Sequence, residues 1–331
     1  MEYINSSLET PESLISLETN EVQTSSTSQP FIEANTIPSS LSEIKKSHII
    51  PVYIKDNETL ISHTDFIEAT MEVVNSVYID QKVLQPTVRV SHPMKGRIPE
   101  ARNKAANELL DHEKTLYYER MAFAIEVPTI QGVVGSNTLS LTIGGVKSYS
   151  LDNLYNRKGA DEHFHVFIGF QNKVCTNLKI WTDGYLGNLK VHSVGQLAAC
   201  IRTMVENYNA GFHLQQLEQL SKYSLTEKQF ATVIGKCRMY QHLPYELKKG
   251  ILPLLMGDTQ IGMVCKDYYK DSRFNSNSDG GIDLWRLYNL FTGANKSSYI
   301  DSFLERSVNA YSLVEQIRFG LEHKGACWYL N

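Results

Sequence analysis

The sequence predicts an α+β fold, with an antiparallel β-sheet and helices in the amino-terminal half and an all-helical carboxy-terminal half. Two patterns carry this prediction. Before residue 193, apolar and polar residues alternate in several short runs, as half-buried strands require. After residue 194, apolar residues recur with the 3.6-residue period of amphipathic helices. We therefore expect a disordered leader at residues 1–44, a sheet domain at 45–193, and a helical domain at 194–331 that packs on the sheet domain.

The leader is set apart by its composition. Residues 1–44 hold seven acidic residues, fifteen Ser or Thr, and no Lys or Arg. They show no sustained apolar period, which is typical of a disordered segment. A short segment such as Phe31 and Ile32 is a candidate to dock on the body. The 32 basic residues all follow the leader and slightly outnumber the acidic residues there, so the charge neither requires nor excludes a polyanion partner.

The clearest strands form a hairpin at 163–184. Phe164, Val166 and Ile168 alternate along its first run, and the polar residues 171–173 predict its loop. Thr64 is the expected N-cap of an amphipathic helix nearer the amino terminus. Further strands, expected to pair antiparallel in one sheet, lie at 48–54, 87–92, 116–127, 138–143 and 187–192.

The second half is predicted to be helical. An apolar stripe from Leu197 to Tyr208 marks the first helix, and Thr226 with Gln229 has the spacing of a capping box at the start of another. Further helices are expected at 245–255, 259–269, 283–291 and from 297 onwards. Pro253 is a candidate early end for the first of these.

Several functional classes are disfavoured by the patterns that the sequence lacks. The amino terminus has no basic segment followed by an apolar one, and no apolar run reaches about 18 residues, so we expect a cytoplasmic protein without a membrane span. The five cysteines are scattered and form no C-x-x-C pair, which predicts reduced cysteines and no metal site. Phosphate-loop and dinucleotide fingerprints are absent as well, so no cofactor is expected.

Two short patterns in the sheet domain carry candidate chemistry. His163 and His165 have the residue type of an acid/base group, but strand alternation favours a solvent-facing pair. Gly144 and Gly145, with Lys147 close by, would let backbone N–H groups approach an anion, but a glycine bend that ends a strand is the favoured interpretation. No nucleophile elbow is present, and no catalytic residue is predicted.

Two further patterns lie nearer the helical half. The turn before Ser298 has open N–H groups beside Lys296 and would suit a phosphate, although Ser298 with Asp301 is typical of ordinary helix capping. Cys175 and Asn177 alternate to the face opposite their apolar neighbours. We expect these two side chains to meet a covering helix or solvent rather than to act as a catalytic pair.

A stretch rich in basic residues and interleaved with tyrosines is the strongest candidate binding surface. Tyrosine rings stack on bases, while basic groups follow the phosphates of a single strand. Several acidic residues dilute the same stretch, so a solvated surface of mixed charge is the competing interpretation, and the sequence alone favours it slightly. The residues concerned are Arg89, Lys95, Arg97, Arg102, Lys104, Tyr117, Tyr118 and Arg120.

Several ungapped blocks of the sequence resemble a known family. They include RVSHPMKGRIPEA, YYERMAFAIEVPTI, FHVFIGFQNKVCTNLKIWTDGY and LYNLFTGANKSSYIDSFLERSVNA. These blocks resemble the uncharacterised family Domain of Unknown Function 3871, which occurs in bacterial genomes and mobile elements and has no established activity. A fainter resemblance, to the phage- and plasmid-type family Domain of Unknown Function 932, is carried by the step from Val174 to Asn177 and by the segment from Asn289 to Tyr299. It implies an association with mobile-element DNA.

These patterns lead to three hypotheses about function. The first is a non-catalytic accessory protein of a mobile element that binds single-stranded nucleic acid. The alternative is a protein-interaction module that uses its helical half to hold a protein partner. An enzyme of unrecognised type comes third, and it requires a pocket with convergent polar groups and a strongly perturbed titrating residue. For the first hypothesis, the expected contact residues are Arg89, Lys95, Arg97, Tyr118, Arg120, Lys147 and Lys296.

Overall fold

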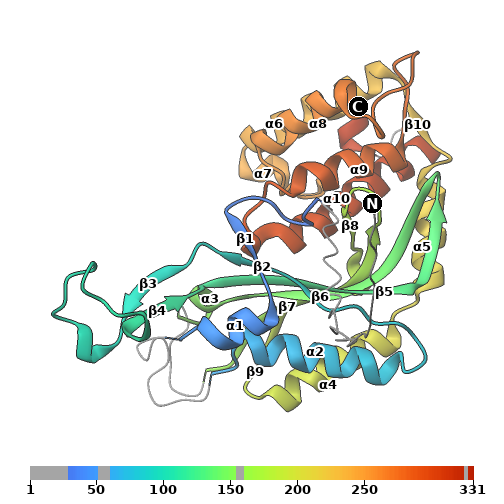
Figure 1. The fold of residues 1–331 in the computed structure, drawn as a ribbon. Helices are drawn as coiled ribbons and strands as arrows, with labels where there is room; N and C mark the ends of the chain where they lie inside the picture. The colour runs from blue at the N-terminus through green and yellow to red at the C-terminus, as the bar shows by residue number, and fades with distance from the viewer. Residues whose placement is uncertain (1–28, 51–59, 154–159, 324–326) are drawn as a thin grey trace, which may run out of the picture.

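The computed structural model describes residues 29–50, 60–153, 160–323 and 327–331. Within these residues, a seven-stranded antiparallel sheet occupies the middle of the molecule in the order β1-β2-β5-β6-β7-β8, with β9 also paired to β7 (Figure 1). Helices lie on both sides of this sheet, so the predicted α+β class is confirmed. The strands are β1 (Thr36–Ser39), β2 (Thr87–Ser91), β5 (Arg120–Val134), β6 (Asn137–Ser148), β7 (Glu162–Asn172), β8 (Leu178–Lys179) and β9 (Tyr185–Val191).

The long hairpin of β5 and β6 forms the centre of the sheet. Its register shifts between Val127 and Gln131, where Pro128 lacks the backbone N–H that a regular ladder needs. Gly135 closes the hairpin with a φ of 59°, a left-handed conformation that glycine adopts without strain. The hairpin therefore extends further than the two shorter strands expected at 116–127 and 138–143.

Helices from both ends of the chain cover the sheet (Figure 1). Along one face lie α2 (His63–Val77) and α4 (Val194–Asn207), with α1 (Leu41–Ser47) beside α2. On the other side lie α9 (Leu284–Asn295) and α10 (Ile300–Glu322). The sheet is thus the middle of three layers, and both of its faces contribute to buried apolar clusters.

A glycine in the middle of the sheet makes room for the α2 layer. The ring of Phe66 packs edge-on against Phe123 and Phe164, with ring centroids 5.0 and 4.9 Å apart. A Cβ atom on Gly145 would lie 2.4 Å from the Phe66 ring, so this position has no space for a side chain. The expected glycine bend at a strand end is wrong, because β6 continues past Gly145 to Ser148.

The second half adds four more helices: α5 (Ala210–Leu220), α6 (Glu227–His242), α7 (Tyr245–Lys248) and α8 (Asp258–Lys270). The short strands β10 (Ser224–Leu225) and β11 (Ile282–Asp283) pair with each other. One large cluster of buried side chains draws residues from both halves of the chain. The domain boundary at residue 194 stays a prediction. None of the described helices is long and apolar enough to cross a membrane.

A two-stranded hairpin projects from the body (Figure 1). Strand β3 (Met94–Arg97) pairs with β4 (Lys114–Tyr117), and residues 98–113 connect them. All four residues of β3 are exposed. We call residues 94–117 the arm. The arm therefore contains much of the stretch that is rich in basic residues, and it protrudes from the body.

Part of the expected disordered leader is ordered. Residues 1–28 lie outside the described residues, but Phe31 and Ile32 are only 2% and 0% exposed, which confirms that this segment docks on the body. Strand β1 and most of α1 also precede residue 45. The leader boundary at residue 44 was wrong because a few apolar side chains of this segment pack against the body. Composition alone does not reveal such packing.

Four local expectations in the sheet domain need correction. The strand expected at 48–54 lies largely outside the described residues, and His48 instead ends α1 and forms one isolated bridge to Leu116. Ser62, not Thr64, caps α2, because Asp65 completes a capping box with Ser62. The strand expected at 116–127 is divided between β4 and β5. The loop expected at 171–173 begins later, since β7 runs to Asn172.

The helical expectations were closer to the structure. Helices α4, α8 and α9 lie where the apolar stripes predict them, and the Thr226 capping box at α6 is confirmed. Helix α7 ends at Lys248, earlier than expected, because Gly250 turns the chain with a φ of 83°. The expected Ser298 cap of α10 is wrong, since Tyr299 occupies the N-cap position. Helix α5 was not expected.

Candidate functional site

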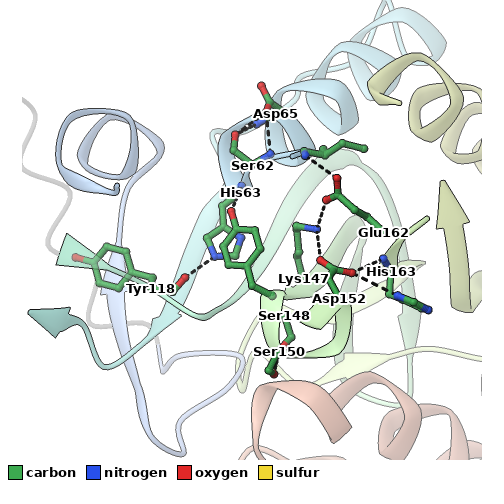
Figure 2. A network of polar contacts seen from close by, with 12 residues as sticks. Ser62, His63, Asp65, Tyr118, Lys147, Ser148, Ser150, Asp152, Glu162 and His163 are labelled. Carbon is green, nitrogen blue, oxygen red and sulfur yellow. Dashed lines mark hydrogen bonds and ion pairs between the residues drawn. The ribbon is translucent and has the colours of Figure 1, made fainter. Parts of the chain in front are cut away.

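Lys147, an expected nucleic-acid contact, lies at the centre of a buried network of charges (Figure 2). Its side chain on β6 is 0% exposed. The Nζ atom donates to Glu162 Oε2 on β7 at 2.8 Å and to Asp152 Oδ2 on α3 (Tyr149–Asn153) at 3.0 Å. The two carboxylates more than balance the ammonium charge, and no part of Lys147 faces a surface that a phosphate reaches.

The same network joins several segments of the chain. Glu162 Oε1 accepts the backbone N–H of Ile61 at 2.9 Å, and Asp152 Oδ1 accepts that of His163 at 2.8 Å. The expected solvent-facing histidine pair is wrong for His163, which is 8% exposed because α3 and its Asp152 cover this side of β7. His165 is partly buried. The network therefore serves to hold α2, α3, β6 and β7 together.

Tyr118, an expected stacking residue, is buried beside this network. Its side chain is 3% exposed. Its carbonyl accepts from His63 Nε2 at 2.8 Å (Figure 2). Its backbone N–H donates to His48 Nδ1 at 3.1 Å. Burial lowers the pKa of His48 to about 4 and that of His63 well below its usual value, so both rings are neutral at pH 7. The Tyr118 ring is thus packed in the interior and cannot stack on a base.

Two further expected contacts, Arg89 and Arg120, hold elements of the fold together. Arg89 Nη2 donates to the Thr36 carbonyl and hydroxyl oxygens, both at 2.8 Å, and so ties β2 to β1. Arg120 Nε forms an ion pair with Asp301 of α10, and its Nη1 lies 3.3 Å from Glu119 Oε2. Both guanidinium groups are partly exposed but already have hydrogen-bond acceptors.

Lys296 is buried in a different place. It is 5% exposed, and its Nζ donates to the Cys175 carbonyl and to Thr176 Oγ1. Of the seven expected contacts, Lys95 and Arg97 are exposed, and they lie together on β3. The structure therefore does not bring the seven residues onto one basic face.

The arm borders a groove of about 910 Å³ that we call the arm groove. Lys46 from α1 lines it together with Lys95 and Arg97 from β3, and all three are exposed. Lys114 also lines the groove but donates to Asp111 at 2.8 Å. The acidic lining residues are Glu43 and Asp111. Three basic side chains without a carboxylate partner among the described residues thus face one concave surface.

A second candidate site lies where the turn at 173–177 meets α9, a contact that we call the seam. Thr176 has a φ of 55°, a strained conformation for a β-branched residue. Asn177 Nδ2 donates to the Asn289 carbonyl at 3.1 Å, which confirms that Asn177 meets a covering helix. Lys179 Nζ donates to Thr292 Oγ1 at 2.7 Å. The seam is therefore a buried polar contact between the sheet and the helical half.

The lysine of the seam has an unusual environment. Lys179 is 0% exposed, and rings surround its Nζ atom, with the centroids of Tyr288 and Trp285 at 4.4 and 5.2 Å. No carboxylate lies within 4.0 Å of it among the described residues. Burial, together with the charge of nearby Lys296, lowers the pKa of Lys179 to about 7. Perturbed titrating groups of this kind cluster at functional sites.

A cavity of about 260 Å³, the seam pocket, opens beside the seam. One side is formed by the turn and α9, and the other by α8 and the loop that follows it. The residues that matter for its chemistry are Cys175, Asn289 and Lys296 on the first side, and Asp267, Asp271 and Arg273 on the second. The pocket has convergent polar groups, but Lys179 does not line it, so the condition stated above for the third hypothesis is met only in part.

The described part of the chain contains no candidate metal-binding site. No group of three His, Cys, Asp or Glu side chains there is arranged to hold a metal ion. The five cysteines, all within the described ranges, are free thiols. Burial raises the pKa of Cys237 to about 12, so this thiol is unreactive at neutral pH.

Several residues in or beside these two sites were not predicted from the sequence. Lys46 was overlooked because it adjoins the expected leader, although the Lys45-Lys46 pair is a visible signal beside the basic stretch. Lys179 and Asp267 belong to ordinary alternating or helical patterns, and no local signal marks them. Their environment arises from segments that are far apart in the chain.

Comparison with known proteins places the chain in a family. A family model described as "Domain of unknown function, B. Theta Gene description (DUF3871)" matches residues 15–330. The chain therefore belongs to this family, as its sequence blocks predicted. No curated protein and no solved structure matches the chain. The comparisons give no support to the fainter resemblance to Domain of Unknown Function 932.

Proposed function

We propose that this protein is a non-catalytic accessory protein that binds single-stranded nucleic acid in the arm groove. The main support for the proposal is that Lys46, from α1, and Lys95 and Arg97, from β3, line one groove of about 910 Å³. Basic groups in a groove follow the phosphates of a flexible strand without reading its sequence. The setting in a mobile element belongs to the same proposal and rests on family resemblance alone.

The binding mode differs from the one that the sequence suggested. Tyr117 and Tyr118 are buried, at 6% and 3% exposed, so base stacking on tyrosine has no support. Apolar side chains such as Ile49, Leu109 and Leu116 line the groove instead and offer surface to the bases. We expect phosphate contacts to supply most of the affinity and the sequence preference to be weak.

The test is a fluorescence-anisotropy titration with a labelled single-stranded oligonucleotide at about 50 mM salt. The variant Lys46→Gln/Lys95→Gln/Arg97→Gln is expected to lose most of the binding. A control with three exposed lysines of the helical half replaced, Lys222→Gln/Lys228→Gln/Lys270→Gln, removes the same amount of charge and is expected to bind like the wild type. Absence of binding by the wild type, or equal losses in both variants, would contradict the proposal.

A second comparison guards against misfolding of the arm. Arg97 Nη1 donates to the Lys104 carbonyl, so its replacement disturbs the arm itself. The double variant Lys46→Gln/Lys95→Gln leaves that bond in place and is expected to weaken binding in part. A protein partner that co-purifies after nuclease treatment, together with no affinity for oligonucleotides, would favour the protein-interaction module instead.

A further inference from the structure

The seam pocket contains two groups of charge that are not paired with each other. The first group is positive. Lys296 Nζ donates to a carbonyl and a hydroxyl oxygen of the turn at 173–177, and Arg273, from the loop after α8, reaches across so that its Nη1 donates to the Val174 carbonyl of the same turn at 3.2 Å. Among the described residues, neither cation has a carboxylate oxygen within 4.0 Å. Glu33 also lines the pocket, and its charge acts on Lys296 from beyond ion-pair distance. Both cations donate only to neutral oxygens, which leaves them able to receive an anion.

The opposite side of the pocket has the complementary arrangement. Asp267 on α8 has no ion-pair partner within 4.0 Å among the described residues, and Asp271 follows one turn later. Burial and the charge of Asp271 raise the pKa of Asp267. Asp271 Oδ1 accepts the backbone N–H groups of Arg273 and Phe274 at 2.8 and 2.7 Å, which fixes the loop after α8. Among the described residues no cation lies within 4.0 Å of these two carboxylates, which leaves a place for one.

A buried polar atom without a partner distinguishes this pocket from a surface irregularity. Asn289, which lines the pocket and is 1% exposed, has a side-chain carbonyl oxygen with no hydrogen-bond partner among the described residues. A buried acceptor without a donor costs about 1–3 kcal/mol, which a bound donor would recover. Thr176, whose hydroxyl accepts from Lys296, holds a strained backbone with a φ of 55°.

We propose that the seam pocket binds a small zwitterion of the amino-acid class. Its carboxylate meets Lys296 and Arg273, and its ammonium group meets Asp267 and Asp271. The cavity of about 260 Å³ suits a small molecule. The two aspartates disfavour a polyanion, and the two cations disfavour a simple amine, so the pocket selects a ligand that carries both charges.

The test is a thermal-shift screen of the full-length protein followed by calorimetric titration. The standard L-amino acids are added one at a time at about 5 mM, because a ligand that binds the folded state raises the melting temperature. At least one amino acid is expected to raise it by several degrees. Acetate, ethylamine and inorganic phosphate at the same concentration each carry one sign of charge and are expected to produce no comparable shift.

Variants then locate the binding. Arg273→Gln and Asp267→Asn are each expected to weaken binding of the selected amino acid about tenfold or more, since each removes a charge-assisted hydrogen bond. Asp80→Asn and Lys222→Gln, which alter exposed charges elsewhere, are expected to bind like the wild type. The proposal is overturned if no amino acid shifts the wild-type melting temperature, if acetate or ethylamine acts equally well, or if both pocket variants bind unchanged.

Discussion

At the scale of single residues, the buried lysines contribute to the stability of the fold and take no part in the proposed nucleic-acid binding. Lys147 and Lys179 are both 0% exposed, yet their surroundings are opposite in kind. Two carboxylates surround Lys147, whereas a hydroxyl group and two aromatic rings surround Lys179. The first lysine has two carboxylates that compensate its charge, whereas burial without such a partner destabilises the charged form of the second.

Replacement of Lys179 by Met tests this difference through pH. The folded-state pKa of about 7 lies below the usual value of 10.5, so the unfolded chain binds more protons than the folded chain between these values. The free energy of unfolding of the wild type is therefore expected to rise from pH 7 to pH 10, by roughly 3–5 kcal/mol from Lys179 alone. Urea unfolding across that range measures it.

In the Lys179→Met variant the rise with pH should largely disappear, leaving the smaller contribution of Lys296, whose pKa burial also lowers. The variant is also expected to be more stable than the wild type at pH 7, because the methionine has no charge to bury. Equal pH dependence in the two proteins would show that Lys179 is not responsible.

Comparison of Lys147→Met with Lys95→Met distinguishes a lysine that stabilises the fold from one that is proposed to bind nucleic acid. Removal of the ammonium group leaves Glu162 and Asp152 buried without their shared partner, which is expected to cost about 3–5 kcal/mol of unfolding free energy. Lys95→Met is the matched control, since Lys95 is exposed on the arm. We expect no change in stability for Lys95→Met but weaker binding to oligonucleotides. Similar stabilities for the two variants would refute this division of roles.

At the scale of elements, the capping box of α2 gives a clean test of why the helix begins where it does. The Ser62 side chain accepts the Asp65 N–H at 3.1 Å, and Asp65 Oδ2 accepts the Ser62 N–H at 2.8 Å. Ser62→Ala is expected to lower the free energy of unfolding by about 1 kcal/mol. Thr64→Ala, at the position that the sequence favoured, is expected to change it by less than half as much, as measured by urea unfolding.

The elements also show what the sequence could and could not predict. The strand that became β2 and the helices α4, α6 and α8 were recognisable because their apolar period or caps are local properties. Helix α5 was missed, although Asn209 accepts the Phe212 N–H at 2.9 Å and so has a readable N-cap. The division between β4 and β5 was unreadable, since alternation continues through Tyr118.

Candidate sites were harder to predict than elements for a physical reason. A basic side chain looks the same in the sequence whether it faces water, as Lys95 does, or two carboxylates, as Lys147 does. The distinction depends on contacts between distant segments, such as that of Lys296 with the turn at 173–177. The sequence therefore indicated the arm as a charged region but could not separate its exposed cations from the buried lysines elsewhere in the chain.

At the scale of the whole molecule, the segment that follows residue 28 joins the sheet to the helical half. The backbone N–H groups of Glu33 and Ala34 donate to the Lys296 carbonyl at 2.9 and 3.2 Å. Phe31 belongs to the same buried cluster as Phe303 of α10, with ring centroids 6.1 Å apart. A segment expected to be disordered thus links two layers of the fold.

Phe31→Ala tests how much this link contributes. Loss of a buried aromatic ring is expected to cost about 3–5 kcal/mol of unfolding free energy. Phe319→Ala on α10 is the matched control, because Phe319 is 45% exposed and its loss should cost far less. Urea unfolding monitored by tryptophan fluorescence compares the two. Equal costs would indicate that the segment adds little to the stability of the whole.

The central claim, that the arm groove binds nucleic acid through phosphate contacts, is tested most directly by the salt dependence of binding. The logarithm of the association constant falls with the logarithm of salt concentration by about 0.7 per neutralised phosphate of a single strand. If Lys46, Lys95 and Arg97 each neutralise one phosphate, the triple variant should show a slope shallower than that of the wild type by about 2. An unchanged slope, or no salt-dependent binding by the wild type, would contradict the claim.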